Sequence, residues 1–146
     1  MSEQEFFAKK AENGYTVCEA KQCRRKESCL LWKVGQNMPA SVMCYTCVNQ
    51  RYPDVATAKC PHYRKAEKVQ MAKGMLNIFN GDMPRRVEPY VRQKLISHYN
   101  HTYYYEYRRG ARLIPPVMQE EIRQLFREAG WSGEVHFDGY VEDYVW

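Results

Sequence analysis

Six cysteines in the first half of the sequence are the residues whose type and spacing could support specific chemistry. They are Cys18, Cys23, Cys29, Cys44, Cys47 and Cys60. Thiolates are soft ligands, which suit zinc, iron–sulfur clusters and copper(I). The alternative is a set of buried, reduced cysteines that act as small apolar side chains. Six cysteines within 43 positions are too dense for that alternative, so the pattern predicts a metal site.

The first way to choose four ligands combines the three earliest cysteines with the last one. Its members are Cys18, Cys23, Cys29 and Cys60. Gaps of four and five residues separate the first three, which is loose for a zinc knuckle but acceptable around a larger cluster. Cys60 precedes Pro61, as in the Cys-Pro ending of bacterial ferredoxin cluster motifs. This grouping predicts zinc or an iron–sulfur cluster.

The second grouping combines two short-spaced pairs and is close to a zinc ribbon, with twenty residues between the pairs. Its members are Cys18, Cys23, Cys44 and Cys47. Cys29 and Cys60 would then be spare, and His62 could replace a thiolate in either grouping. The spacing alone leaves both groupings open.

No complete catalytic motif accompanies the cysteines. The sequence has no glycine-rich phosphate loop, no His-Glu-x-x-His and no Gly-x-Ser-x-Gly. A general base at His98 or His101 is conceivable, but a solvated or packing role is commoner for such histidines. Cys44 and Cys47 have the spacing of a redox dithiol without the strand-to-helix context that lowers a thiol pKa. We therefore expect a non-catalytic protein, with an iron–sulfur or dithiol redox protein as the alternative.

Length and hydrophobicity describe an ordinary globular chain. It has 146 residues, of which 45% are hydrophobic, enough for one domain with a buried core. No stretch approaches the roughly 18 apolar residues of a membrane span, and residues 1–15 do not resemble a secretory signal. We therefore expect a cytoplasmic protein, where thiols are kept reduced and six cysteines favour metal ligation, whereas a secreted protein would form disulfides instead.

Helical periodicity begins after the cysteines. An apolar repeat predicts a helix that starts near Arg64 and stops at Gly81. Its repeating residues are Val69, Ala72, Leu76 and Phe79. Residues 15–63 show little periodicity, and only their apolar run at residues 29–34 is expected as a short strand or a turn or two of helix.

Two further helices are expected in the second half. One spans residues 87–99, where apolar residues recur at spacings of four. The other opens at the proline pair 115–116 and ends at Gly130, with a continuous apolar stripe between. The tyrosine-rich run at residues 101–110 fits either a strand or a short buried helix.

These patterns predict an α+β fold that is predominantly helical. Residues 1–63 are expected to form a cysteine-rich module held together by the metal. This module should pack on a small helical half, residues 64–146, so that the two form one compact unit. The apolar residues of the acidic tail, from Val135 to Trp146, are expected to dock on the core.

Charge is unevenly distributed along a chain whose net charge is +5. Residues 85–113 contain seven basic and two acidic residues, whereas residues 114–146 contain two basic and seven acidic ones. One interpretation is that these segments neutralise each other within the fold. The other is a face that binds nucleic acid or an acidic protein partner through arginines and stacking tyrosines. Its candidate residues are Arg85, Arg86, Tyr103, Tyr105, Arg108, Arg109 and Arg112.

Several short motifs are spread over most of the chain. They are Cys18, Cys23 and Cys29 with Leu30-Leu31-Trp32, then Cys60-Pro61-His62-Tyr63-Arg64, Tyr103-Tyr104-Tyr105-Glu106-Tyr107-Arg108-Arg109, Gln119 with Ile122, Leu125 and Phe126, Phe137-Asp138-Gly139-Tyr140, and Tyr144-Val145-Trp146. In these motifs the sequence resembles an uncharacterised family of short, cysteine-rich bacterial proteins, a domain of unknown function found mainly in gut anaerobes. The family pattern includes the first grouping of cysteines but not Cys44 or Cys47. The resemblance therefore favours the first grouping and implies no function.

Overall fold

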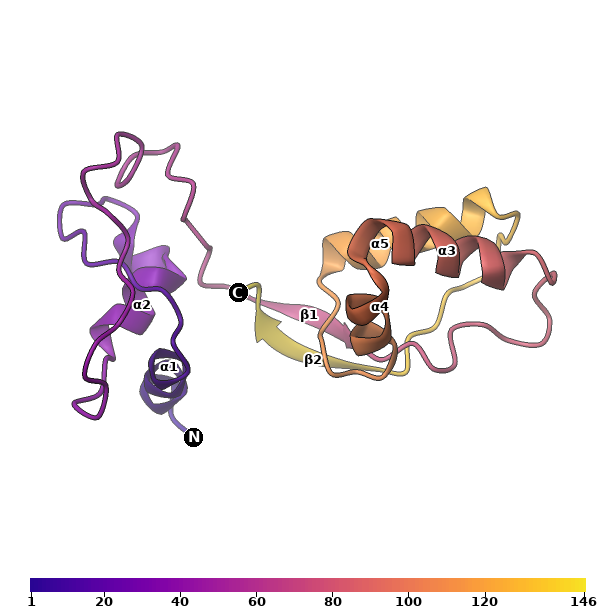
Figure 1. The fold of residues 1–146 in the computed structure, drawn as a ribbon, viewed down its shortest axis with the longest axis horizontal. Coiled ribbons are helices and arrows are strands. Elements are labelled where there is room, and N and C mark those ends of the chain that lie inside the picture. The colour runs from indigo at the N-terminus through magenta and orange to yellow at the C-terminus, as the bar shows by residue number, and fades with distance from the viewer. The chain divides into compact units, whose positions relative to one another are not determined.

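The computed structural model describes residues 1–146, which form two compact units. The cysteine unit consists of residues 1–67 and 144–146, and the helical unit consists of residues 68–143. Five α-helices, one 3-10 turn and a two-stranded antiparallel sheet make the fold α+β and mostly helical, as predicted. In chain order the elements are α1 (Glu3–Glu12), η1 (Lys26–Ser28), α2 (Leu30–Gln36), β1 (Lys68–Lys73), α3 (Val87–Tyr99), α4 (His101–Arg108), α5 (Pro116–Glu128) and β2 (Gly139–Tyr144) (Figure 1).

Helix α1 begins with a reciprocal cap. The Glu5 backbone N–H donates to Ser2 Oγ at 3.1 Å, and the Ser2 backbone N–H donates to the Glu5 carboxylate at 2.7 Å. This capping box satisfies amides that have no partner inside the helix. The helix then buries Phe7 and Ala11 in the core of the cysteine unit. The spacing Ser-x-x-Glu is a sequence signal for this helix, which was not among the predicted elements.

The last residues of the chain complete the same core. Tyr144 is buried beside Phe7, with ring centroids 5.7 Å apart, and its hydroxyl donates to Glu3 at 2.9 Å. Trp146 packs edge-on against Tyr15 at 5.0 Å, with the Lys10 ammonium 4.1 Å from its ring. The prediction that the aromatic tail docks on a core is confirmed for both residues.

Helix α2 packs apolar side chains into two clusters of the cysteine unit. Leu30 and Val34 join the core around α1, and both are fully buried. Leu31 and Trp32 join a second cluster that contains Cys29. Full burial of a Leu or Val contributes about 1.5–3 kcal/mol, so this short helix is held mainly by its packing.

The helix predicted over residues 64–81 is wrong. Residues 68–73 form strand β1, and the chain continues to residue 86 without a helix. β1 pairs with β2, and Ala72 also exchanges backbone hydrogen bonds of 2.9 Å with Ile114. The apolar repeat mimicked a helical stripe, but pairing with distant residues decided the conformation.

A single carboxylate ends β1. Asp138 accepts hydrogen bonds from the backbone N–H groups of Leu76 at 2.8 Å and Asn77 at 3.0 Å. Its own N–H donates to the Gly74 carbonyl at 3.0 Å. Gly74 has φ of +89°, and a Cβ there would lie 2.6 Å from an Asp138 oxygen. Glycine is therefore required at position 74, and these bonds give Asp138 a structural role in the turn.

Helices α3, α4 and α5 provide most of the core of the helical unit. Its most buried members on these helices are Val87, Val91, Leu95, Tyr104, Met118, Ile122 and Phe126. The predicted helix over residues 87–99 is confirmed as α3, and the proline-initiated helix is confirmed as α5. The tyrosine run is the helix α4 rather than a strand, and the Asn100 side chain caps it by accepting from the Tyr103 N–H at 3.0 Å.

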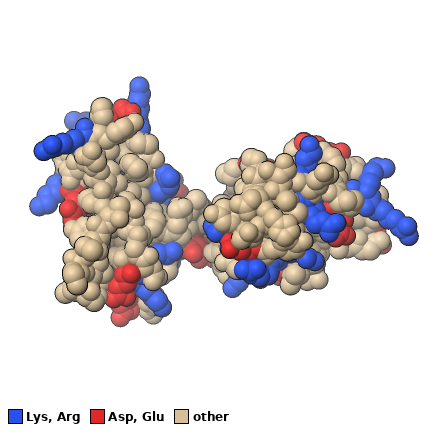
Figure 2. Space-filling model, in the orientation of Figure 1, with Lys and Arg blue, Asp and Glu red and all other residues tan.

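The surface carries charges of both signs on both units. Figure 2 shows lysine and arginine side chains spread over each unit, with acidic groups among them. No helix of the protein is both long and apolar enough to cross a membrane.

Gln119 is the one polar side chain buried in the protein core. Its amide nitrogen donates to the backbone carbonyls of Ile114 at 2.9 Å and Gln70 at 3.0 Å. It thus ties α5 to β1 inside the helical unit.

We expect Gln119→Leu to lower the free energy of unfolding of the helical unit by about 1–3 kcal/mol, because two carbonyls lose a donor in a buried place. Chemical denaturation followed by circular dichroism measures this loss. Gln124→Leu is the matched control on the same helix, where the exposed side chain bonds only to Arg127, and should change stability by less than about 0.5 kcal/mol. Equal effects of the two substitutions would contradict the assigned role of Gln119.

Candidate metal centre

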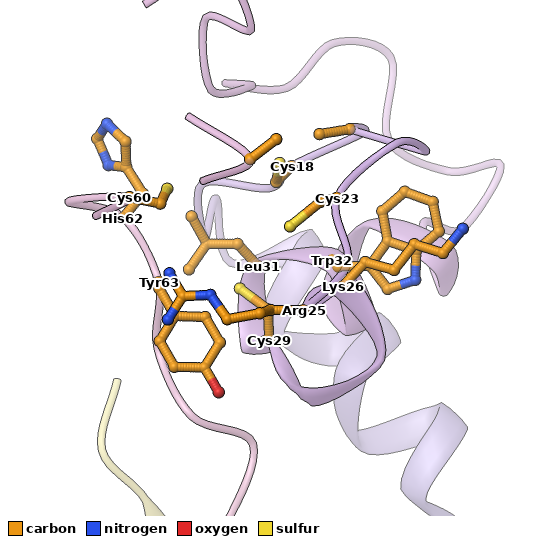
Figure 3. Close-up of a pocket in the computed structure, with 12 residues that line it drawn as sticks. Cys18, Cys23, Arg25, Lys26, Cys29, Leu31, Trp32, Cys60, His62 and Tyr63 are labelled. Carbon is orange, nitrogen blue, oxygen red and sulfur yellow. The ribbon is translucent and has the colours of Figure 1, made fainter. Parts of the chain in front are cut away.

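Four of the six cysteines line one small cavity of the cysteine unit. They are Cys18, Cys23, Cys29 and Cys60 (Figure 3). The cavity has a volume of about 20 Å³, and Leu31 and Trp32 supply much of its apolar wall. Cys44 and Cys47 are exposed and take no part in it. Three separate stretches of the chain therefore bring the first grouping of cysteines to one place.

The first stretch places Cys18 and Cys23 beside α2. The Cys18 N–H donates to the Leu31 carbonyl at 3.1 Å, and the Cys23 N–H closes a turn onto Ala20 at 3.1 Å. A Cβ at Gly35 would lie 3.1 Å from the Cys18 carbonyl oxygen. The lack of a side chain at Gly35 thus lets the Cys18 segment lie directly on the helix.

The second and third stretches meet through backbone pairing. The Leu30 N–H donates to the Arg64 carbonyl at 2.8 Å, and the Ala66 N–H donates to the Ser28 carbonyl at 2.8 Å. Cys29, which immediately precedes α2, lies between these two bonds and is buried. The same pairing holds the preceding turn, in which the Cys60 N–H donates to the Thr57 carbonyl at 3.2 Å.

The surroundings of Cys18 disfavour its thiolate form. Burial raises the pKa of the Cys18 thiol, and neighbouring Cys29, Cys47 and Cys60 raise it further, while a backbone hydrogen bond from Ala20 lowers it. Because like charges repel, thiolates gathered here need a cation to coexist. Metal binding would supply that cation and release the thiol protons.

The four thiols surround the cavity without forming a closed ligand set. No three histidine, cysteine or acidic side chains of the protein are close enough together to hold one metal ion. A cavity of about 20 Å³ is slightly larger than the roughly 10–15 Å³ that one water molecule needs. The chemistry of four cysteine donors fits zinc or an iron–sulfur cluster, and binding either would require the cysteine side chains to reorient.

His62 and two cationic residues complete the lining. His62 and Lys26 are among the lining residues, and no acidic side chain lines the cavity. Arg25 donates from Nη2 to the Thr57 carbonyl at 2.9 Å, and its guanidinium carbon lies 4.0 Å from the Tyr63 ring centre. Arg25 was not expected from the sequence, where its only local signal is its position two residues after Cys23.

Cys44 and Cys47 lie in an extended segment. The Val17 N–H donates to the Thr46 carbonyl at 3.0 Å, and the Val48 N–H donates to the Val17 carbonyl at 2.9 Å. No backbone hydrogen bond joins Cys47 to Cys44, so the two do not form the tight turn of a zinc knuckle.

The arginines of the basic segment, residues 85–113, make different kinds of contact. Arg86 donates to the Ala129 carbonyl at 3.1 Å, which is a structural contact. Arg112 pairs with Glu106 at 2.9 Å and lies 4.2 Å from the ring centre of Tyr103. The interpretation that the acidic tail neutralises this segment is therefore wrong for Arg112, whose partner belongs to the basic segment itself.

The other candidate residues of this segment differ in exposure and pairing. Arg85 and Arg109 are exposed, Arg108 is half-buried, and none of the three forms an ion pair. Tyr103 is 42% exposed, whereas Tyr105 is half-buried. Since α4 is a helix, these tyrosines do not alternate between two faces as they would on a strand.

Comparison with known proteins identifies the family of the chain. A family of unknown function, DUF6078, matches residues 1–146, and the protein belongs to that family. Neither the curated proteins nor the solved structures contain a match.

We expect the two exposed cysteines to react first with a thiol reagent in the native protein. Cys44 and Cys47 should be alkylated by iodoacetamide much faster than Cys29, whose residue is only 8% exposed. Peptide mass spectrometry after short exposure measures the order of labelling, and a denatured sample in which all six react is the control. Labelling of Cys29 at the rate of Cys44 would contradict the packing described above.

Proposed function

We propose that the protein is a small metal-binding protein whose cysteine unit is stabilised by a four-thiolate centre. The ligands are Cys18, Cys23, Cys29 and Cys60, and the metal is zinc or an iron–sulfur cluster. The observation that carries this proposal is that these four cysteines line a single cavity although they come from three separate stretches of the chain.

A metal would have a clear physical role in this unit. Residues 37–67 contain no helix and no named strand, and most of their backbone hydrogen bonds close local turns. A metal that joins Cys60 to the three earlier cysteines would cross-link these loops to α2. Because such a site forms only on folding, its binding free energy also stabilises the fold.

The two metals would supply different chemistry. Zinc bound by four thiolates is closed to substrates and acts as a structural support. An iron–sulfur cluster transfers single electrons, and the Cys60-Pro61 pair supports that alternative. We take the structural role as the main proposal, because no complete catalytic motif accompanies the site.

The helical unit is proposed to carry the partner-binding surface of a regulator or adaptor. Arg85, Arg108 and Arg109 have no acidic partner within the protein, which leaves their charges available to phosphates or to an acidic protein. Tyr103 beside Arg112 offers one exposed ring for stacking on an unpaired base. Nucleic acid is the partner we propose to test first.

We expect Cys23→Ser and Cys60→Ser each to lower the metal content of protein purified without oxygen. A decrease of about 2 kcal/mol in the free energy of unfolding of the cysteine unit would lower its melting temperature by roughly 8–16 °C. Elemental analysis measures the metal, and visible absorption separates a brown cluster from colourless zinc.

The matched control for these variants is the double substitution Cys44→Ser with Cys47→Ser. It removes two thiols of the same loops that do not line the cavity, and it should keep both metal and stability. Unchanged metal content in Cys23→Ser and Cys60→Ser would refute the proposed ligands. Loss of metal in the double variant would instead favour the ribbon-like grouping.

We expect single-stranded RNA to bind at low salt and to dissociate as salt rises, because phosphate contacts release counterions. Arg108→Glu with Arg109→Glu should weaken binding and reduce the salt slope by about two. Fluorescence anisotropy at several salt concentrations measures both. Arg51→Glu with Lys59→Glu makes the same change in charge at exposed sites of the cysteine unit and should have little effect. Binding that responds equally to both pairs would indicate only general attraction of a basic protein.

A further inference from the structure

Arg25 has an unsatisfied donor at the thiol cavity. Its Nε is the only buried side-chain nitrogen or oxygen of the protein without a hydrogen-bond partner. Arg25 also lines the cavity together with the four cysteines (Figure 3). Leaving a buried donor of a charged group unpaired costs more free energy than leaving a neutral donor unpaired, so an orphan donor here indicates a missing acceptor.

The rest of the guanidinium is held firmly in place. Nη2 donates to the Thr57 carbonyl at 2.9 Å, and the group lies over the Tyr63 ring at 4.0 Å. Tyr63 is in turn held by its hydroxyl contact to Ser28 Oγ at 3.0 Å. The Thr57 carbonyl also accepts from the Cys60 N–H, so one carbonyl positions both Arg25 and a proposed ligand.

The charge of the cavity lining suits an anionic occupant. Four thiolates around one zinc ion, or around a cluster, form a complex with net negative charge. The lining contains two cationic residues and no carboxylate. Lys26 is already engaged, because its ammonium donates to the Lys21 carbonyl at 2.9 Å and lies 5.0 Å from the Trp32 ring centre. Arg25 Nε is the buried donor of this lining that has no acceptor.

We infer that Arg25 is the positioning residue that compensates the charge of the thiolate centre, with its Nε–H donating to a sulfur of that centre. This inference rests on the proposed function, since it assigns a partner to the same four ligands. A hydrogen bond to a ligand sulfur and a fixed positive charge both stabilise bound thiolates. Outer partners of this kind typically account for 10–100-fold in metal affinity.

The first test compares Arg25→Gln with Arg24→Gln in the full-length protein. Arg24 is adjacent, exposed and outside the cavity, so the two variants lose the same charge at different places. Competition with a chromophoric chelator measures the affinity for Zn²⁺. Arg25→Gln should weaken binding by roughly 10–100-fold, and Arg24→Gln should weaken it much less. Equal affinities of the two variants would overturn the inference.

A second measurement separates a hydrogen bond to sulfur from a purely structural role. In the Co²⁺-loaded protein, loss of a donor to sulfur should move the thiolate-to-cobalt charge-transfer band to longer wavelength in Arg25→Gln. Arg24→Gln removes the same charge outside the cavity and keeps Arg25, so its band should stay at the wild-type position. An unshifted band in Arg25→Gln would overturn the inference even if affinity falls.

These measurements distinguish failure of the proposed metal binding from failure of the inference about Arg25. If the isolated protein carries an iron–sulfur cluster, the reduction potential of the cluster is measured in place of the cobalt spectrum. This potential should be lower in Arg25→Gln than in Arg24→Gln. A wild-type protein that binds no metal at all would refute the proposed function and this inference together. A wild-type protein that binds metal through the four cysteines, with no effect of Arg25→Gln on affinity or spectrum, would refute the inference alone.

Discussion

The short backbone pairing between residues 28–30 and 64–66 is the constraint on which the cysteine unit depends. Through the bonds of Leu30 to Arg64 and of Ala66 to Ser28, it brings the last cysteine to the side of α2 where the earlier three already lie. These bonds also place Tyr63 against the Arg25 guanidinium. The same backbone pairing therefore positions both the arginine and the cysteines that line the cavity. Two hydrogen bonds contribute little to stability by themselves, about 1 kcal/mol each. Their importance is that they determine which thiols become neighbours.

The helical unit depends on a comparable long-range contact. Asp138 receives the two amides that follow β1, and Gly74 provides the space for it. This contact ends the strand, directs the chain toward α3 and aligns β2 beside β1. In both units, hydrogen bonds between residues distant in sequence hold the irregular segments in place. The helices supply most of the buried apolar surface.

Local signals predicted the parts of the fold that are locally determined. Proline at the start of α5, glycine after it and apolar spacing in α3 define these helices without distant partners. β1 was mistaken for a helix because its pairing partners lie more than forty residues away. The choice of four cysteines came from spacing and resemblance, and the cavity is consistent with it. Arg25 was not predictable, because its significance comes from an unpaired nitrogen that only the packed structure reveals.

The path of the chain through the two units has a consequence for synthesis. The cysteine unit is interrupted after residue 67 and receives its last members, residues 144–146, only after the whole helical unit has been made. While the ribosome is still adding the later residues, Phe7 and Tyr15 lack the aromatic rings that cover them in the finished protein. The N-terminal half, although it emerges first, therefore completes its core last.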